Sequence, residues 1–175
     1  MNLQGKRVLV FGTGKSGIGA ADLLGETGAH VILFDGNEKT DKDAVLTKVS
    51  HAEDASVYAG ELPKEVLESL DLVILSPGVP TDIPIVKKFY EMGLPVWGEV
   101  ELAYRTSKGR VLAITGTNGK TTTTALLGKI MSDAEDSVFV VGNIGTPYTS
   151  KALEMKPNSV TVAEISSFQL ETIDE

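Results

Sequence analysis

RVLVFGTGKSG, residues 7–17, decides the fold of the first half of the chain. Its first five residues form a nearly continuous apolar run, as expected for a strand buried on both faces of a parallel sheet. The glycine-rich turn leads into a helical pattern, which we expect to begin near Ser16 and to end at Gly28 in a left-handed cap. A second apolar run at residues 30–34 ends in Asp35, so this segment predicts a strand–helix–strand unit.

Apolar runs and helical patterns alternate along the rest of the chain. We expect further strands at residues 72–75, 96–97, 111–114, 138–141 and 160–163, and helices from residue 63, along 85–89, over 99–106 and after the loop at 115–120. The last of these helices carries Leu126, Leu127, Ile130 and Met131 on one face. The pattern predicts an α/β fold: a Rossmann-like N-terminal domain with a parallel sheet, followed by part of a P-loop-type α/β ATPase domain.

We place the boundary of these domains near Gly98, which gives a first domain of residues 1–98 and a second of residues 99–175. The second contains three strands at most, fewer than a complete domain of this class usually has. A parallel sheet cut at this point would expose a strand edge. We therefore expect the chain to be a fragment of a longer protein.

Composition excludes several functional classes. The chain has 175 residues and a net charge of -8, which disfavours binding to nucleic acid or to an acidic membrane. It contains no cysteine, so disulfides, thiolate metal sites and cysteine nucleophiles are excluded. No apolar run approaches the roughly 20 residues that span a bilayer, and the chain starts directly with a strand pattern. We expect a cytoplasmic protein that binds phosphates through a few local groups.

The first glycine-rich loop, GTGKSG at residues 12–17, lies between a predicted strand and a predicted helix. In such loops the first glycine permits a tight turn, the second (Gly14) lets a ligand approach the backbone, and the third lets helix and strand pack closely. The helix N-terminus then offers N–H groups to a diphosphate. Asp35 ends the next strand, where an acidic residue often meets a ribose or base. The pattern favours nucleotide binding, with NAD as an alternative ligand.

The second loop, TGTNGKTT at residues 115–122, has the functional end of a phosphate loop. Ile114 stands where the standard motif has its first glycine, but Gly-Lys-Thr follows a strand and opens a helix. Lys120 can neutralise the β- and γ-phosphates of ATP, and the Thr121 hydroxyl can coordinate Mg²⁺. The residues that we expect to bind ATP are Gly116, Thr117, Asn118, Gly119, Lys120, Thr121 and Thr122.

An acidic residue and an amide-containing turn follow the next two apolar strands. Glu164 ends the strand SVTVA, where its carboxylate could act on Mg²⁺ as a Walker B acid does. We select Lys120 and Glu164 as the catalytic candidates, and Thr121 and Glu164 as the metal ligands. The turn Gly142-Asn143-Ile144-Gly145 reads equally well as a substrate loop and as an ordinary glycine–asparagine turn.

At this point the motifs resemble a family. ITGTNGKTTT (residues 114–123) is similar to the ATP loop of the Mur ligases, the ATP-dependent amide-bond formers of peptidoglycan synthesis. GNIGTP (142–147) and EISSFQLE (164–171) resemble the branch of that family that adds D-glutamate. GTGKSG and SPGV (76–79) fit its UDP-binding domain. The resemblance covers essentially the whole chain.

The resemblance implies a ligase that uses ATP and Mg²⁺ to join D-glutamate to UDP-N-acetylmuramoyl-L-alanine through an acyl phosphate. It implies that Lys15 and Ser16, beside Gly14, hold the diphosphate, that Asp35 binds the uracil and that Gly78 lines the uridine pocket. Asn143, Ser166 and Gln169 would contact the muramoyl-alanine end. The family often has Thr-Arg after the uracil-binding aspartate, where this chain has Gly36-Asn37.

The family residues that complete catalysis and bind D-glutamate would lie mostly beyond residue 175. We therefore expect this chain to bind parts of its substrates without completing turnover. Two alternatives remain open from the sequence: an NAD-dependent dehydrogenase that uses the first loop, and a non-catalytic nucleotide-binding module. We expect neither nucleic acid nor a membrane as a partner.

Overall fold

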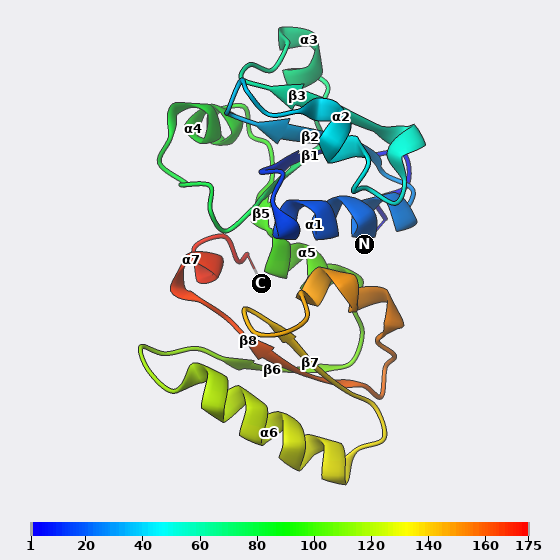
Figure 1. Cartoon of the computed structure of the whole chain (residues 1–175), viewed down its shortest axis with the longest axis vertical. Coiled ribbons are helices and arrows are strands. Elements are labelled where there is room, and N and C mark those ends of the chain that lie inside the picture. Colours follow the sequence, from blue (N-terminus) through cyan, green and yellow to red (C-terminus); the bar gives the residue numbers. More distant parts are fainter. Residues whose placement is uncertain (1, 175) are drawn as a thin grey trace.

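The computed structural model describes residues 2–174, and its first part is a five-stranded parallel sheet in the order β3-β2-β1-β4-β5 (Figure 1). The strands are β1 (Arg7–Phe11), β2 (His30–Asp35), β3 (Ala55–Ala59), β4 (Leu72–Leu75) and β5 (Val96–Gly98). The order reverses between β1 and β4, which pair directly with each other. In open parallel sheets ligands bind outside the carboxyl ends of the strands at such a reversal.

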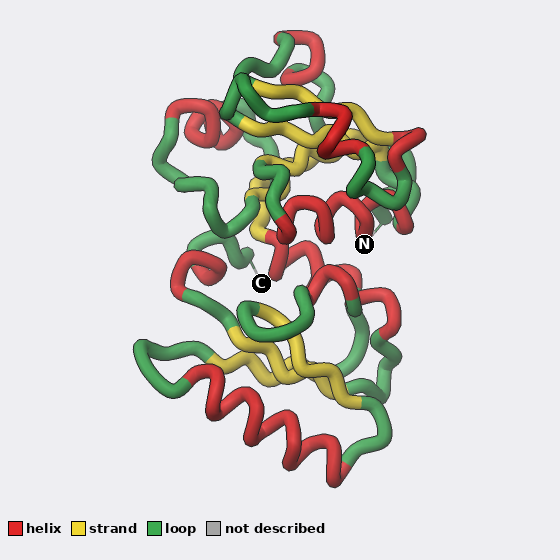
Figure 2. The backbone as a smooth tube through the Cα atoms, viewed as in Figure 1, coloured by secondary structure: helices red, strands yellow, loops and turns green. Residues whose placement is uncertain are grey.

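Helices cover both faces of this first sheet (Figure 2). They are α1 (Lys15–Glu26), α2 (Lys42–Leu46), α3 (Lys64–Leu67) and α4 (Pro84–Glu91), with the short 3₁₀ turn η1 (Ala52–Asp54) before β3. The side chains of successive strand residues point alternately to the two faces of the sheet. Val8 and Val10 pack with α1, whereas Leu9 and Phe11 pack with α3 and α4. The strands are therefore apolar on both sides, as the sequence predicted.

The second part is a three-stranded parallel sheet in the order β6-β8-β7. Its elements are α5 (Glu99–Thr106), β6 (Arg110–Ile114), α6 (Lys120–Ala134), β7 (Val138–Gly142), η2 (Tyr148–Ser150), η3 (Ala152–Glu154), β8 (Val160–Glu164) and α7 (Ser167–Leu170). The core on the α1 face of the first sheet continues through Leu102 and Ala103 of α5 to Val141 and Ala163 of the second sheet. Helix α5 thus lies between the two sheets and contacts elements of both (Figure 1).

The predicted α/β fold with parallel sheets is confirmed. The helix expected near Ser16 begins at Lys15, and Gly28 follows it with φ of 77°. The N–H of Gly28 donates to the Gly25 carbonyl (2.9 Å) and that of Ala29 to the Leu24 carbonyl (3.1 Å), so the helix ends in a Schellman cap. Since α5 contacts β4 and β5 of the first sheet and also η2 and η3 of the second part, we keep the division into residues 1–98 and 99–175 as a proposal.

Several short elements were not predicted, among them β3, α2, α7 and the 3₁₀ turns. Strand β3 is the edge of the first sheet and only one of its residues is buried, so its sequence ASVYA lacks a strong apolar run. Helix α2 spans a single turn and a half, and the Asp41 side chain caps it by accepting from the N–H of Ala44 (3.0 Å). Such short, exposed elements leave a weak signal in the sequence.

The packing of α6 differs from its apolar pattern. Its buried residues are Thr124 and Gly128, whereas Leu126 and Ile130 are 61% and 53% exposed. A Cβ on Gly128 would lie 2.5 Å from a methyl group of Val140 in β7, so the helix approaches the sheet too closely for a larger residue. The small residues therefore face the sheet, and the predicted apolar face is only partly covered.

Candidate functional site

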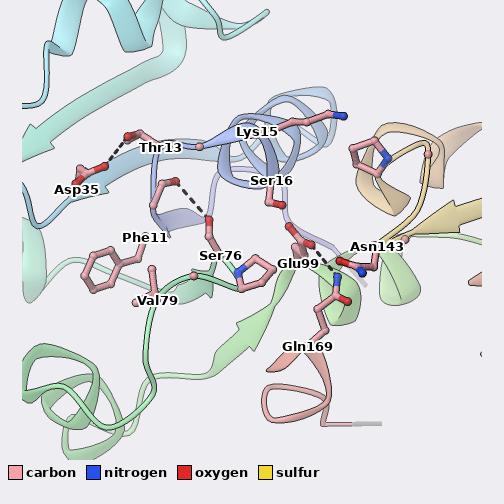
Figure 3. Close-up of a pocket in the computed structure, with 17 residues that line it drawn as sticks. Phe11, Thr13, Lys15, Ser16, Asp35, Ser76, Val79, Glu99, Asn143 and Gln169 are labelled. Atoms are coloured by element: carbon pink, nitrogen blue, oxygen red, sulfur yellow. Dashed lines mark hydrogen bonds between the residues drawn. The ribbon is translucent and has the colours of Figure 1, made fainter. Parts of the chain in front are cut away.

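A cavity of about 580 Å³ lies at the carboxyl edge of the first sheet, where the strand order reverses (Figure 3). The first glycine-rich loop forms one wall, and the loop at residues 76–79 forms another. The second part of the chain completes the lining with Glu99, Asn143 and Gln169, among others. The cavity therefore brings together residues that are more than 150 positions apart in the sequence.

The glycines of the first loop have the geometry that their roles require. Gly12 has φ of 105°, in the region that favours glycine. A Cβ on Gly17 would lie 1.8 Å from the Gly12 carbonyl oxygen, which leaves no room for a side chain. A Cβ on Gly14 would meet nothing within 4 Å, so the space in front of this residue is open to a ligand. No side chain caps α1, and its first N–H groups remain available to an anion.

Asp35 lies at the end of β2 and lines the same cavity. The Thr13 hydroxyl donates to its Oδ2 (2.6 Å), and the N–H of Asn37 donates to its Oδ1 (3.0 Å). Burial raises the pKa of Asp35, but these hydrogen bonds together outweigh burial and hold the pKa below its usual value. The carboxyl is thus kept ionised as an acceptor, and Asn37 takes part through its backbone.

The other residues predicted to bind the UDP-substrate fall into two groups. Gly14, Lys15, Ser16, Gly78, Asn143 and Gln169 all line the cavity. Ser166 does not; its side chain caps α7 by accepting from the N–H of Gln169, whose Oε1 in turn accepts from the N–H of Ser166. This capping box leaves the Gln169 amide nitrogen free to reach the cavity, where it donates to Glu99 Oε1 (3.1 Å).

The second loop runs from the end of β6 to the start of α6, and residues 115–119 are exposed. Gly119, the N-cap residue of α6, has φ of 77°, and no side chain caps this helix. The Lys120 ammonium group donates to the Gly116 carbonyl (2.7 Å) and so folds over its own loop. The loop therefore presents a lysine and uncapped backbone N–H groups to solvent, an arrangement that can cradle phosphates.

Glu164 is buried (2% exposed) at the end of the central strand β8. It pairs in register with Ile114 on one side and with Gly142 on the other. Since the second loop begins directly after Ile114, it starts beside Glu164. The Asn143 side-chain amide donates to Glu164 Oε1 (3.1 Å), whereas Oε2 is buried and has no hydrogen-bond partner among the described residues.

These groups fit a magnesium ion. The unsatisfied oxygen of Glu164 and the hydroxyl of Thr121 are hard oxygen donors, the type that Mg²⁺ prefers. Within residues 2–174 no group of three or more His, Cys, Asp or Glu side chains is arranged to hold a metal. A Mg²⁺ ion here would complete its shell with nucleotide phosphates and water, as it usually does in phosphoryl-transfer sites. In the same range of residues, no helix is both long and apolar enough to cross a membrane.

Among the charged residues that line the cavity, Glu99 is the one that the sequence analysis did not select. An acidic residue in the first turn of a helix is common, because it interacts favourably with the helix dipole. No local motif marks Glu99, and only the tertiary fold brings it beside Gln169.

Comparison with known proteins identifies a family. The family description "Mur ligase MurD-like, N-terminal domain" matches residues 6–98, and "Mur ligase middle domain" matches residues 114–175. A curated relative from Lachnospira eligens, named UDP-N-acetylmuramoylalanine--D-glutamate ligase, is 54% identical over 175 residues, which are 100% of this chain and 39% of the relative. A relative of the same name from Lachnoclostridium phytofermentans is 53% identical over 99% of this chain and 38% of the relative. The chain thus spans less than half the length of these relatives.

Solved structures share the fold. A pseudomurein peptide ligase type C from Methanothermus fervidus aligns with a TM-score of 0.50 and 23% identity, over 93% of this chain and 33% of that protein. A murein peptide ligase from Psychrobacter arcticus aligns with a TM-score of 0.51 and 20% identity, over 93% of this chain and 37% of that protein. The first family description matches residues 6–98, which are more than half of this chain, and the chain therefore belongs to the Mur ligase family.

Proposed function

We propose that this chain carries the UDP-sugar-binding and ATP-binding parts of a ligase that adds D-glutamate to UDP-N-acetylmuramoyl-L-alanine. The observation that carries the proposal is the position of Asn143. This residue lines the cavity beside the first loop and also donates to Glu164, next to the start of the second loop. Asn143 therefore lies between the cavity of the first loop and the strand end where the second loop begins. The names of the relatives support the same activity.

The first loop and its surroundings would bind the UDP-sugar. The diphosphate would lie against Gly14, Lys15 and Ser16, where N–H groups of α1 and one lysine offset its charge. Asp35, held ionised by Thr13, would accept from the N–H of the uracil. The muramoyl-alanine end would then extend toward Asn143 and Gln169, on the side of the second sheet.

The second loop would bind ATP. Backbone N–H groups of residues 116–120 would surround the phosphates, and Lys120 would neutralise the β- and γ-oxygens. Thr121 and Glu164 would hold Mg²⁺, which would supply charge neutralisation at the transferring phosphate. A carboxylate oxygen of the L-alanine attacks the γ-phosphorus, a new P–O bond forms and the bond to ADP breaks. Catalysis of this step is positioning plus electrostatic stabilisation.

Amide formation follows from the acyl phosphate. The amine of D-glutamate attacks the carbonyl carbon, the new C–N bond forms, and inorganic phosphate leaves while the amine loses a proton. None of the described residues is assigned to D-glutamate. The contribution of this chain is therefore the activated end of the UDP-substrate, presented beside the ATP phosphates.

The test is a ligand-binding experiment with four ligands: UDP-N-acetylmuramoyl-L-alanine, UDP, ATP with Mg²⁺, and NADH. A ligand present at about 100 Kd should stabilise the native state by about 2.7 kcal/mol in thermal unfolding, and calorimetry gives its affinity. We expect stabilisation by the UDP-sugar and by ATP with Mg²⁺. The change Asp35→Asn should weaken the UDP-sugar only, whereas the matched change Asp43→Asn, at an exposed position of α2, should not.

Two results would contradict the proposal. Stabilisation by NADH without a response to the UDP-sugar would assign the first loop to a dehydrogenase. Stabilisation by ATP alone, with no UDP-sugar binding, would indicate a non-catalytic nucleotide-binding module.

A further inference from the structure

Glu99 joins the two walls of the cavity (Figure 3). It is the first residue of α5 and lies between Ser16 of α1 and Gln169 of α7. The Gln169 amide donates to Glu99 Oε1 (3.1 Å), and the Ser16 side chain lies on the other side of this carboxyl (Figure 3). The carboxyl of Glu99 therefore lies beside the same Ser16 that we assign to the diphosphate.

The second oxygen of Glu99 has no partner. Oε2 is buried and makes no hydrogen bond among the described residues. An ionised carboxyl with a buried oxygen and no donor is costly, because the lost hydration is not replaced. Burial accordingly raises the pKa of Glu99, and the hydrogen bonds of Ser16 and Gln169 only oppose this rise in part. Protonation of Oε2 would remove the cost.

The charges around Glu99 also favour protonation of its carboxyl when an anion binds. The other charged residues that line the cavity are Lys15 and Asp35, and Asp35 stays ionised. Glu164 lies behind Asn143 and adds a further carboxyl group. On α5 itself, Glu101 and Arg105 pair with each other and with the segment at Asp174. A diphosphate beside Lys15 and Ser16 therefore enters a site with one lysine and several carboxyl groups.

We propose that Glu99 is a protonation-coupled gate for the diphosphate: when ionised it places a negative charge beside Ser16 and repels the ligand, and when protonated it lets the ligand bind. Binding of the UDP-sugar is then accompanied by uptake of a proton from solvent onto the Glu99 carboxyl. The inference rests on the proposed function, since it requires that the first loop binds a diphosphate.

The sign of the pH dependence follows from linkage. The bound diphosphate favours the protonated form of Glu99, so the pKa of Glu99 is higher in the complex than in the free protein. The affinity for the UDP-sugar is greatest at pH values below the pKa that Glu99 has in the free protein. It falls as the pH rises from that pKa to the pKa that Glu99 has in the complex. Above the second pKa the affinity is constant. Each unit between the two pKa values corresponds to a tenfold change in affinity.

The experiment is calorimetric titration of UDP-N-acetylmuramoyl-L-alanine into the chain between about pH 5.5 and 8.5. The phosphates of this ligand are both esterified, so they do not titrate in this range. We expect the affinity of the unmodified chain to fall with pH, whereas Glu99→Gln keeps a constant affinity that is roughly tenfold higher at the upper end. The matched control Glu26→Gln removes an equal charge at the exposed far end of α1 and should behave as the unmodified chain.

Proton uptake is measured separately, from the dependence of the binding enthalpy on the ionisation enthalpy of the buffer. The unmodified chain should take up protons in the range where its affinity changes, and Glu99→Gln should not. This measurement on the unmodified chain tests the gate even if Glu99→Gln unfolds, which thermal unfolding of the variant would reveal.

The outcomes separate the gate from the function. If the UDP-sugar binds but Glu99→Gln weakens it, Glu99 accepts a hydrogen bond from the ligand and the gate is refuted. Equal affinities, or binding of the unmodified chain without proton uptake, would refute the gate as well and leave the proposed function intact. If the UDP-sugar binds to neither the unmodified chain nor Glu26→Gln, the proposed function fails and the gate with it.

Discussion

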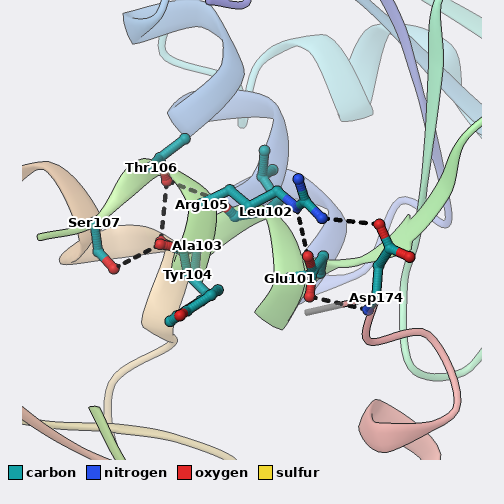
Figure 4. Close-up of polar contacts among 8 residues, drawn as sticks. All are labelled: Glu101, Leu102, Ala103, Tyr104, Arg105, Thr106, Ser107 and Asp174. Atoms are coloured by element: carbon teal, nitrogen blue, oxygen red, sulfur yellow. Dashed lines mark hydrogen bonds and ion pairs between the residues drawn. The ribbon is translucent and has the colours of Figure 1, made fainter. Parts of the chain in front are cut away.

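The change Arg105→Met removes the cation beside a buried carboxylate of α5 (Figure 4). Glu101 is 1% exposed, and its Oε1 accepts from Arg105 Nε while its Oε2 accepts from the N–H of Asp174 (3.2 Å). Arg105 also donates to the Asp174 side chain (2.8 Å), and its guanidinium lies 4.5 Å from the centre of the Trp97 ring. The pair therefore joins α5, β5 and the last described residues of the chain.

The expected cost follows from burial. Removing one partner of a buried ion pair typically costs about 3–5 kcal/mol, because an uncompensated charge stays behind. The Arg105 side chain is 19% exposed, so water can partly reach the site and we take the lower end. Loss of the cation–π contact adds about 0.5–1 kcal/mol. Methionine keeps the apolar stem over Trp97 and avoids a further loss, so we expect a total loss of about 3.5–4 kcal/mol in the free energy of unfolding.

Urea denaturation measures this loss. Trp97 is the only tryptophan of the chain, and its fluorescence reports on the region that is changed. Circular dichroism in the same samples tests whether the whole chain unfolds together. The control is Asp174→Asn, since the Asp174 side chain is 65% exposed and its pair with Arg105 should contribute at most about 1 kcal/mol.

A double-mutant cycle separates the buried charge from simple loss of contacts. Glu101→Gln in the Arg105→Met background removes the uncompensated charge, so we expect it to restore about 1–2 kcal/mol. If the second change instead destabilises further by its own single-mutant amount, the two residues act independently. Additive effects, or a loss below about 1 kcal/mol for Arg105→Met, would refute the reasoning.

Three further changes test the loops. Gly17→Ala should lower the free energy of unfolding by about 3 kcal/mol in the urea assay, because the new Cβ would lie 1.8 Å from the Gly12 carbonyl oxygen. Gly14→Ala is the control: its Cβ would meet nothing within 4 Å, so it should cost at most about 1 kcal/mol. Equal losses for the two changes would contradict this reasoning. Thr13→Val should raise the pKa of Asp35, because the burial that raises it remains while a hydrogen bond that lowers it is lost. The stability that ionised Asp35 contributes is lost as the pH falls through this pKa. In the variant this loss should therefore begin at a higher pH. Carboxyl NMR titration measures the shift, with Asp71 as an internal control, and an unchanged Asp35 would show that Thr13 has no effect. Lys120→Met should weaken ATP–Mg²⁺ by about 2 kcal/mol, roughly 30-fold in calorimetry, whereas Lys129→Met on the exposed side of α6 should not.

The sequence predicts those elements whose signal is local. Strand β4 is apolar at every residue and β1 at every residue after Arg7, so both are recognisable without a structure. Gly28 marks the end of α1 because a left-handed cap requires glycine. Strand β3 lacks such a signal, since it pairs on one side only and is mostly half-buried.

The candidate site can likewise be predicted only where its signal is local. The residues of each loop follow from motifs, since glycine, lysine and threonine are needed in a fixed local order. Glu99 does not, because its partner Gln169 lies 70 residues away and is brought near only by the fold. The same holds for the contact of Arg105 with Asp174, 69 residues away. The packing of α6 through Gly128 is likewise decided by the distance between helix and sheet.

The strand register explains why the second loop begins close to Asn143, a residue that lines the cavity of the first loop. Glu164 pairs with both Ile114 and Gly142, so the segments after β6, β7 and β8 begin side by side. The segment after β7 carries Asn143, whose N–H donates to the Glu164 carbonyl (2.9 Å) and whose side chain donates to Oε1. These two bonds fix Asn143 against the central strand while it lines the cavity. A ligand that contacts Asn143 from the cavity would therefore touch the residue that donates a hydrogen bond to Glu164, the proposed magnesium ligand.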